Sequence, residues 1–338
     1  MLLVVNLLVL FTAAVALNDQ FSFFADWTDL RGTFFGGPVG VTAHAGAGAA
    51  QAAGVVIKPP SLAATSPALP GLPPGASSTD RVLRYTVTGA ASGLSGTVLV
   101  TLPEGYTLPA NQSRRYPVLE TFSGYPGEPS EWIDSMNLGN ALDQAVAQHT
   151  LGPVITISPT TEFPPGVDTE CVDGPGGFPK VETWLTQDVP NWVMRTLRVR
   201  TDRASWATIG LSTGGWCAAM ATMLHPGQYA AGIVMGGYYQ PDFSSNYVPF
   251  RSNSAEAQRY NLVALARYRP PPVALWLETS HSDPVSYPST ARLLAAAHAP
   301  LSIQALVLAH AGHRTSLWSS ELPQVLTWLG RYIPGFAP

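Results

Sequence analysis

The sequence predicts an α/β protein whose central sheet is mostly parallel and covered by helices on both faces. Three observations support this fold class. The chain has 338 residues, of which 46% are hydrophobic and only 12% are charged, so it can bury a large core. An alternating strand pair occupies residues 81–102, as in an opening hairpin. From residue 116 onward, short apolar stretches alternate with longer stretches of helical character.

Each predicted strand is a short run of β-branched and other apolar residues. The strands are expected at Arg81–Thr88, Gly96–Leu102, Tyr116–Phe122, Pro153–Ser158, Trp206–Leu211, Ala231–Met235, Val273–Glu278 and Leu301–Leu308. The predicted helices fall between them and after the last strand. They are expected at Trp132–Gln148, Val181–Val199, Trp216–Leu224, Ser254–Tyr268, Tyr287–His298 and Leu322–Tyr332. In a sheet built this way, ligands bind at the carboxyl ends of the strands.

The region before the first strand has a different composition. Residues 1–17 are almost entirely apolar, and no Lys or Arg precedes Arg31. This indicates a membrane anchor, with an atypical signal peptide cleaved near Ala14–Ala16 as the alternative. Either interpretation places the rest of the chain outside the cytoplasm. Residues 18–78 are first rich in aromatic residues and then in Ala, Gly and Pro, which predicts a collar and a flexible linker before a catalytic domain at 79–338.

The most informative stretch is Gly210-Leu-Ser-Thr-Gly214, a G-x-S-x-G pattern between a predicted strand and a predicted helix. In α/β-hydrolases, this sharp turn raises a nucleophilic serine above the sheet. The pattern therefore predicts an α/β-hydrolase fold with Ser212 as the nucleophile.

A serine nucleophile needs a histidine base and an acid that orients it, which follow it in the order Ser, Asp or Glu, His. His310 and His313 both lie in the loop after the last strand, and we favour His313 because it lies farther from the strand end. The preceding strand ends near Glu278 and Asp283. We expect Asp283 to be the acid, with Glu278 as the alternative.

The oxyanion formed during acyl transfer requires two N–H donors. Thr213, which follows the nucleophile, is expected to supply one of them. The other should come from the loop after the third strand, where Ser123-Gly-Tyr125 stands and Tyr125 is the best candidate.

Several segments resemble the Putative esterase family, the α/β-hydrolase group that contains antigen 85 mycolyltransferases, S-formylglutathione hydrolases and feruloyl-type esterases. Actinobacterial secreted or membrane-anchored members are the most similar in appearance. The resemblance rests on the Ser212 stretch, Phe122–Trp132, Val181–Val193 and Ala311–Trp318. It implies the same nucleophile, base and oxyanion donors. Mycolyltransferases differ, because their acid is a Glu farther beyond the strand.

Composition excludes several function classes. The net charge of −4 shows no basic footprint for nucleic acid, and no metal, nucleotide or flavin motif is present, so no cofactor is expected.

Cys171 and Cys217 have no metal-ligand spacing. Outside the cytoplasm such a pair is often a disulfide, which here would tie the loop at 160–180 to the nucleophile helix. Two buried thiols are the alternative.

The sequence therefore predicts a serine carboxylester hydrolase that acts outside the cytoplasm on an ester substrate. An acyltransferase with a sugar hydroxyl as acceptor would use the same residues. A catalytically silent surface or binding protein is the alternative from another functional class.

Overall fold

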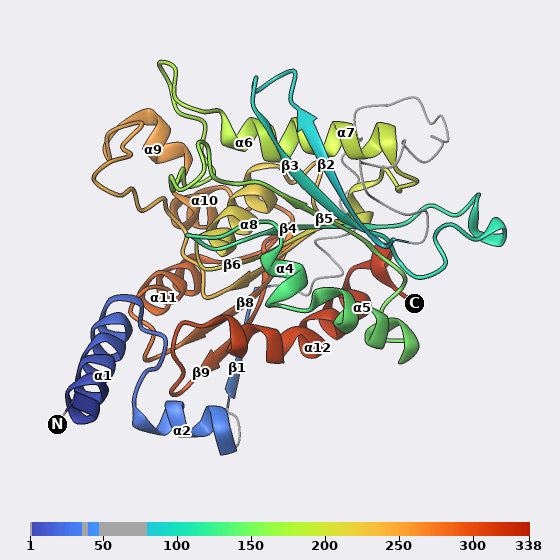
Figure 1. Cartoon of the computed structure of the whole chain (residues 1–338). Helices are drawn as coiled ribbons and strands as arrows, with labels where there is room; N and C mark the ends of the chain where they lie inside the picture. Colours follow the sequence, from blue (N-terminus) through green and yellow to red (C-terminus); the bar gives the residue numbers. More distant parts are fainter. Residues whose placement is uncertain (1, 36–39, 47–79) are drawn as a thin grey trace.

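The structure, a computed structural model, describes residues 2–35, 40–46 and 80–338, and its centre is a nine-stranded sheet in the order β1-β9-β8-β7-β6-β4-β5-β3-β2 (Figure 1). The strands are β1 (Gly40–Gly46), β2 (Val82–Thr88), β3 (Ser95–Thr101), β4 (Val118–Phe122), β5 (Ile155–Pro159), β6 (Trp206–Leu211), β7 (Ala231–Met235), β8 (Ala274–Ser280) and β9 (Ser302–Leu308). Neighbouring strands are parallel from β5 through β4, β6, β7 and β8 to β9. The predicted α/β-hydrolase fold class is confirmed.

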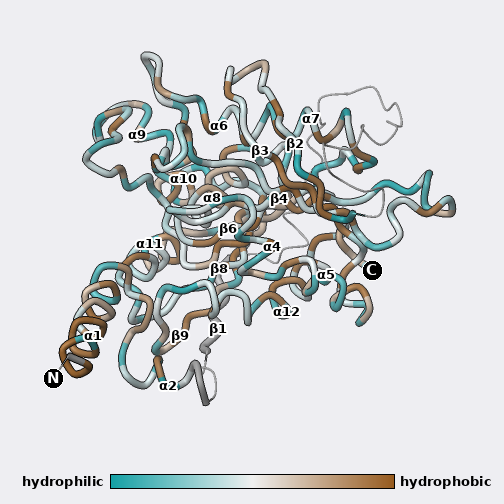
Figure 2. Tube along the Cα trace, viewed as in Figure 1, coloured by the Kyte–Doolittle hydropathy of each residue, from teal (hydrophilic) through white to brown (hydrophobic). Residues whose placement is uncertain are grey.

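Helices cover both faces of this sheet, and each face has its own apolar core. One core lies between the sheet and α6 (Val181–Thr183), α7 (Val189–Thr196), α8 (Thr213–Leu224), α10 (Leu262–Tyr268) and α11 (Tyr287–Ala296). The other lies against α4 (Glu131–Asp134), α5 (Leu138–Ala147) and α12 (Thr315–Tyr332). The strands at the centre are apolar along most of their length (Figure 2), which fits a sheet covered on both faces.

Three predicted helices are interrupted in the structure. Asn137 adopts a left-handed conformation with φ 51° and separates α4 from α5. A π-helical turn at Trp184–Asp188 lies between α6 and α7. The stretch predicted at 254–268 forms α9 (Ala255–Arg259) and α10, and the side chain of Asn261 caps the second helix by accepting from the Ala264 N–H. Apolar periodicity continues across these breaks, so it could not reveal them.

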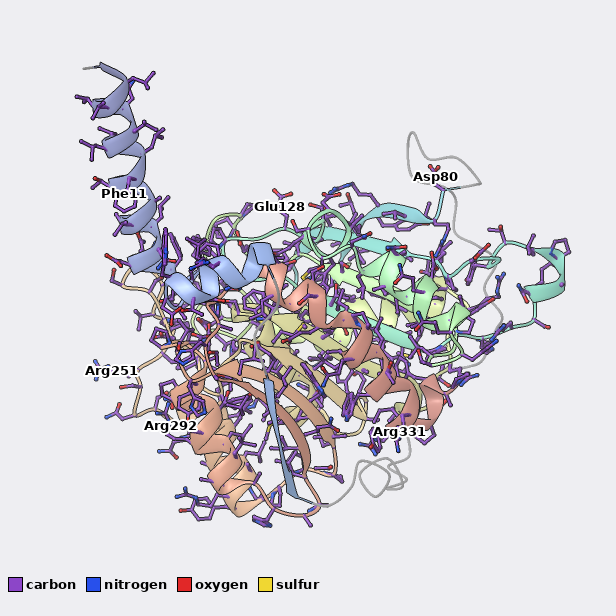
Figure 3. All side chains as sticks on the ribbon, turned by 90° about the horizontal axis from the view of Figure 1, so that it is seen from below. Phe11, Asp80, Glu128, Arg251, Arg292 and Arg331 are labelled. Carbon is purple, nitrogen blue, oxygen red and sulfur yellow. A yellow bond between two sulfur atoms is a disulfide. The ribbon has the colours of Figure 1, made fainter. Side chains whose placement is uncertain are left out.

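The amino-terminal region includes two helices, α1 (Leu2–Phe21) and α2 (Trp27–Phe35). Residues Leu3–Phe21 of α1 are apolar and long enough to cross a membrane by length and composition, and none of the most apolar stretch is buried. Figure 3 shows α1 projecting away from the body of the protein, with Phe11 on its surface.

In the described part of the predicted collar and linker at 18–78, residues 40–46 form a strand that the sequence did not predict. β1 pairs antiparallel with β9 and extends the sheet at its edge. The sequence Gly-Val-Thr-Ala-His-Ala-Gly alternates only over Val41–Ala45 and merges into an Ala- and Gly-rich stretch; it lacks a longer alternation of large apolar residues, so no strand was expected there. Backbone hydrogen bonding to an available edge does not require such a pattern. Residues 47–79 of the predicted linker lie outside the described residues.

Candidate active site

Ser212 lies at the sharp turn between β6 and α8, at the carboxyl edge of the sheet. Its backbone has φ 54° and ψ −123°, a conformation that costs a non-glycine residue free energy and is found mainly at functional sites. The flanking glycines make the turn possible. A Cβ on Gly210 would lie 1.8 Å from the Gly214 carbonyl oxygen, and one on Gly214 would lie 2.0 Å from the Phe122 carbonyl oxygen.

A chain of hydrogen bonds connects Ser212 with two of the predicted residues. Ser212 Oγ lies 2.8 Å from His313 Nε2, and His313 Nδ1 lies 2.9 Å from Asp283 Oδ2. Only 11% of the His313 side chain is exposed, and 5% of the Asp283 side chain. The register of the parallel strands brings the loops after β6, β8 and β9 to one edge of the sheet, although His313 is 101 residues from Ser212.

The carboxylate of Asp283 is held by the start of the segment that follows it. Its Oδ1 accepts from the Val285 N–H at 2.8 Å and the Ser286 N–H at 3.3 Å, and its Oδ2 accepts from the Ser286 hydroxyl at 2.6 Å. Burial raises the pKa of Asp283, but the hydrogen bonds from His313, Ser286 and Val285 outweigh it and leave the pKa below its usual value. Asp283 is therefore ionised at neutral pH.

Glu278, the alternative acid, is in a different position. It lies within β8, is 2% exposed, and accepts a hydrogen bond from the Trp318 indole N–H at 2.9 Å. Burial raises its pKa to about 8, so it is protonated at neutral pH. Trp318 packs edge-on against the His313 ring, with centroids 4.8 Å apart. Glu278 therefore supports a neighbour of His313, and the structure pairs His313 with Asp283.

His310, the alternative base, is remote from the serine. Its side chain is 65% exposed, and its Nδ1 lies 3.3 Å from the Ser282 hydroxyl and 3.6 Å from Asp26. The expectation that His313 is the base agrees with this arrangement.

The loop proposed for oxyanion binding lies directly against the serine. A Cβ on Gly124 would be 3.4 Å from the Cβ of Ser212. The loop is fixed by hydrogen bonds from the Gly124 N–H to Glu131 at 3.2 Å and from the Gly127 N–H to Glu162 at 2.9 Å. In the part of the chain that the structure describes, no protein group accepts from the N–H of Tyr125 or of Thr213, the first residue of α8. Both remain available to a ligand.

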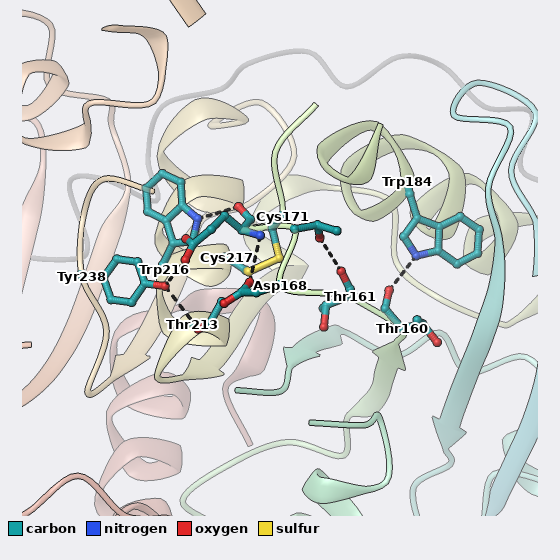
Figure 4. The surroundings of a disulfide bond; sticks show 11 residues. Thr160, Thr161, Asp168, Cys171, Trp184, Thr213, Trp216, Cys217 and Tyr238 are labelled. Carbon is teal, nitrogen blue, oxygen red and sulfur yellow. Dashed lines mark hydrogen bonds between the residues drawn. A yellow bond between two sulfur atoms is a disulfide. The ribbon is translucent and has the colours of Figure 1, made fainter. Parts of the chain in front are cut away.

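The predicted disulfide is present. Cys171 and Cys217 are joined by an S–S bond of 2.02 Å, and both residues are buried. As Figure 4 shows, the bond ties the loop before α6 to the nucleophile helix, and the Trp216 indole N–H donates to the Glu170 carbonyl oxygen at 2.7 Å beside it.

Two carboxyl groups beside the nucleophile helix, those of Asp168 and Glu170, were not predicted from the sequence. Tyr238 donates a 2.7 Å hydrogen bond to Glu170, and its hydroxyl lies 3.2 Å from the Thr213 hydroxyl. Burial raises the pKa of Asp168 to about 6 and that of Glu170 well above its usual value. The only sequence signal for their position is Cys171, because its predicted bond to Cys217 places residues 168–170 beside α8.

Among the described residues, no group of three or more His, Cys, Asp or Glu side chains is arranged to hold a metal ion. The side chains that the structure brings together at the turn are a hydrogen-bonded serine, histidine and aspartate.

Comparisons with known proteins identify the family and the fold. The model of the family described as Putative esterase matches residues 90–328. An uncharacterised protein of Corynebacterium glutamicum is 34% identical over 133 residues, which are 39% of this chain and 30% of that protein. The alignment thus spans less than a third of that relative's length.

Two solved structures share the fold. A ferulic acid esterase superposes with a TM-score of 0.61 at 20% identity, over 74% of this chain and 97% of that chain. An S-formylglutathione hydrolase from Agrobacterium tumefaciens superposes with a TM-score of 0.62 at 12% identity, over 76% of this chain and 98% of that chain.

Proposed function

Because the chain belongs to the Putative esterase family, we propose that it is a serine esterase that hydrolyses carboxylic esters through an acyl-enzyme on Ser212. The observation that carries this proposal is the continuous hydrogen-bonded chain from Ser212 Oγ through His313 to Asp283, at 2.8 and 2.9 Å. A catalytically silent protein would not need to keep these three side chains in contact.

In the proposed reaction, Ser212 Oγ attacks the acyl carbon while His313 Nε2 accepts the hydroxyl proton. The ionised Asp283 holds the imidazole in the tautomer that leaves Nε2 free to accept that proton, and stabilises the imidazolium that forms. His313 then protonates the departing alcohol. A water molecule, deprotonated by the same nitrogen, attacks the acyl-enzyme and releases the acid.

The N–H groups of Thr213 and Tyr125 would bind the oxyanion of each tetrahedral intermediate. Two features support this role: both belong to segments packed against Ser212, and the Glu131 and Glu162 bonds described above fix the Tyr125 loop. Such preorganised donors each contribute about 10²-fold or more to the rate of acyl transfer.

We also propose that the enzyme acts outside the cytoplasm and is attached to a membrane through α1. The exposed apolar surface of Leu3–Phe21 supports attachment, because water does not stabilise such a surface. The Cys171–Cys217 disulfide supports an oxidising compartment. We place the catalytic set in the domain predicted at 79–338, on which the described segments 22–29 and 40–46 pack.

The test uses the full chain in detergent with p-nitrophenyl butyrate and a fluorophosphonate probe. Ser212→Ala should lower kcat by at least about 10³-fold and abolish labelling by the probe. Ser282→Ala is the matched control, because this serine lies near the site and contacts His310 rather than His313; it should keep wild-type activity. Hydrolysis that persists in Ser212→Ala would refute the nucleophile. Product analysis with added sugar or alcohol acceptors distinguishes hydrolysis from acyl transfer.

A further inference from the structure

The segment that follows α1 lies on the loop that carries His313. We call residues 22–29 the N-terminal strap. It begins where the apolar helix ends at Phe21 and runs into the first turn of α2. Its first residue already contacts the histidine loop, because the His313 N–H donates to the Ser22 carbonyl oxygen at 2.7 Å.

Asp29 makes the strongest contacts of the strap. Its Oδ2 accepts from the Gly312 N–H at 2.7 Å, and its two carboxylate oxygens accept from the two terminal nitrogens of Arg314, both at 2.7 Å. Arg314 also donates to the Phe23 carbonyl oxygen at 3.0 Å. The strap therefore bonds to three consecutive residues, with His313 in the middle.

These contacts are buried and closely fitted. Asp29 is 4% exposed and Arg314 is 9% exposed. A Cβ on Gly312 would lie 2.0 Å from the Phe23 carbonyl oxygen, so the strap touches the loop backbone directly. The guanidinium of Arg314 lies 4.8 Å from the centre of the Phe24 ring. A buried, bidentate ion pair fixes orientation, and the loss of one partner leaves a desolvated charge.

The strap also has its own internal order, as a positioning element needs. The Asn18 side chain accepts from the Phe24 N–H at 2.7 Å and donates to the Phe24 carbonyl oxygen at 3.0 Å. The Ala25 N–H donates to Asp29 at 3.0 Å. Asp29 is thereby connected to the end of α1.

We propose that the N-terminal strap is part of the active enzyme, with Asp29 and Arg314 as positioning residues for the catalytic base. This inference rests on the proposed role of His313. The strap bonds to the backbone N–H groups of Gly312 and His313 and to the side chain of Arg314, so it acts on the position of the imidazole. A displacement of about 1 Å in a catalytic group lowers a rate by about 10²-fold. Cleavage near Ala14–Ala16 would leave the strap intact, so the proposal holds for both an anchored and a processed chain.

The experiment compares Asp29→Asn, Gly312→Ala and the control Asp19→Asn in the full chain in detergent. Asp19 is an exposed aspartate of α1, so the control makes the same chemical change outside the strap. The first two variants perturb the contact from opposite sides. Each should lower kcat for p-nitrophenyl butyrate and the rate of fluorophosphonate labelling by about 10- to 100-fold. KM should stay within about threefold, because no strap residue is proposed to touch substrate.

The double variant Asp29→Asn with Arg314→Gln separates positioning from stability. Asp29→Asn alone leaves the Arg314 guanidinium buried without a charged partner, and Arg314→Gln removes that guanidinium. The Tm of the double variant should therefore recover toward that of the wild type while its kcat stays low. Asp29→Glu, which keeps the charge, should regain part of kcat. The proposal is overturned if Asp29→Asn keeps kcat within twofold of Asp19→Asn, or if kcat recovers with Tm in the double variant. Activity in Ser212→Ala would instead refute the proposed function itself.

Discussion

The acid that orients His313 is open to a direct test, because the structure gives two carboxyl groups different roles. Asp283→Asn should lower kcat by about 10⁴-fold, whereas Glu278→Gln should change it by less than about threefold. The two substitutions are chemically identical, each replacing a carboxyl by an amide. Their expected difference arises only from the surroundings of each side chain.

The magnitude for Asp283→Asn follows from its hydrogen-bond partners. An amide nitrogen in place of Oδ1 would face the N–H groups of Val285 and Ser286, which cannot reverse. The amide therefore turns its nitrogen toward His313 and the Ser286 hydroxyl, which can rotate to accept. His313 must then accept at Nδ1 and carry its proton on Nε2, so it can no longer take the proton of Ser212. This tautomer change is the known cause of losses of about 10⁴-fold in serine hydrolytic triads.

Glu278 offers a sensitive control for this reasoning. Burial raises its pKa to about 8, so its uncharged form predominates at pH 7 and does little to stabilise an imidazolium. A glutamine carbonyl can still accept from Trp318, which donates to Glu278 at 2.9 Å. The assay is steady-state hydrolysis of p-nitrophenyl butyrate by folded protein, with circular dichroism and Tm measured for each variant. A folded Asp283→Asn with near wild-type kcat, or a Glu278→Gln that is equally impaired, would refute the assignment.

Two further predictions concern stability. Burial raises the pKa of Glu120 and Glu278 from 4.5 to about 8, so between these values the folded state holds protons that the unfolded state lacks. The free energy of unfolding should then fall by about 1.4 kcal/mol per pH unit for each carboxyl as the pH rises toward 8, and Tm should decrease from pH 5 to pH 9. Glu120→Gln should make this decrease shallower, whereas a Tm that increases with pH would contradict the reasoning. The disulfide closes a loop with a sequence separation of 46 residues. Removal of the disulfide in the double variant Cys171→Ser with Cys217→Ser should lower the free energy of unfolding by about 4 kcal/mol and Tm by about 6 °C. An unchanged melting curve would show that the disulfide contributes little to stability.

Most of the fold could be predicted because its signals are local. Each parallel strand is a short apolar run, and the turn at Ser212 needs small residues at Gly210 and Gly214 to avoid backbone clashes. The order of serine, acid and histidine along the chain reflects the order of parallel strands, so the loops that carry them could also be found. The fold class was correctly predicted on this basis, the family from the resemblance of several segments, and the disulfide from a single cysteine pair expected outside the cytoplasm. The catalytic roles stay predictions that the geometry supports.

The sequence favoured Asp283 over Glu278 and His313 over His310, but the local pattern left both alternatives open. Asp283 and Glu278 are five residues apart and equally able to orient an imidazole. The register of β8 directs Glu278 toward Trp318, while the loop beyond it brings Asp283 to His313 at 2.9 Å. His310 and His313 differ in the same way, since the side chain of His310 is exposed and that of His313 lies against Ser212.

The sequence by itself determined the α/β-hydrolase fold, the serine at its turn and the loops that supply its partners, because these depend on steric and apolar patterns within a few residues. Only the tertiary structure decided that β1 extends the sheet and that Asp29 binds the loop of His313. Asp29 and its partner Gly312 in that loop are 283 residues apart along the chain. The physical reason is that such contacts are made largely by backbone groups and single charges. They leave no pattern that local analysis separates from the surrounding sequence, and they exist only once the chain has folded.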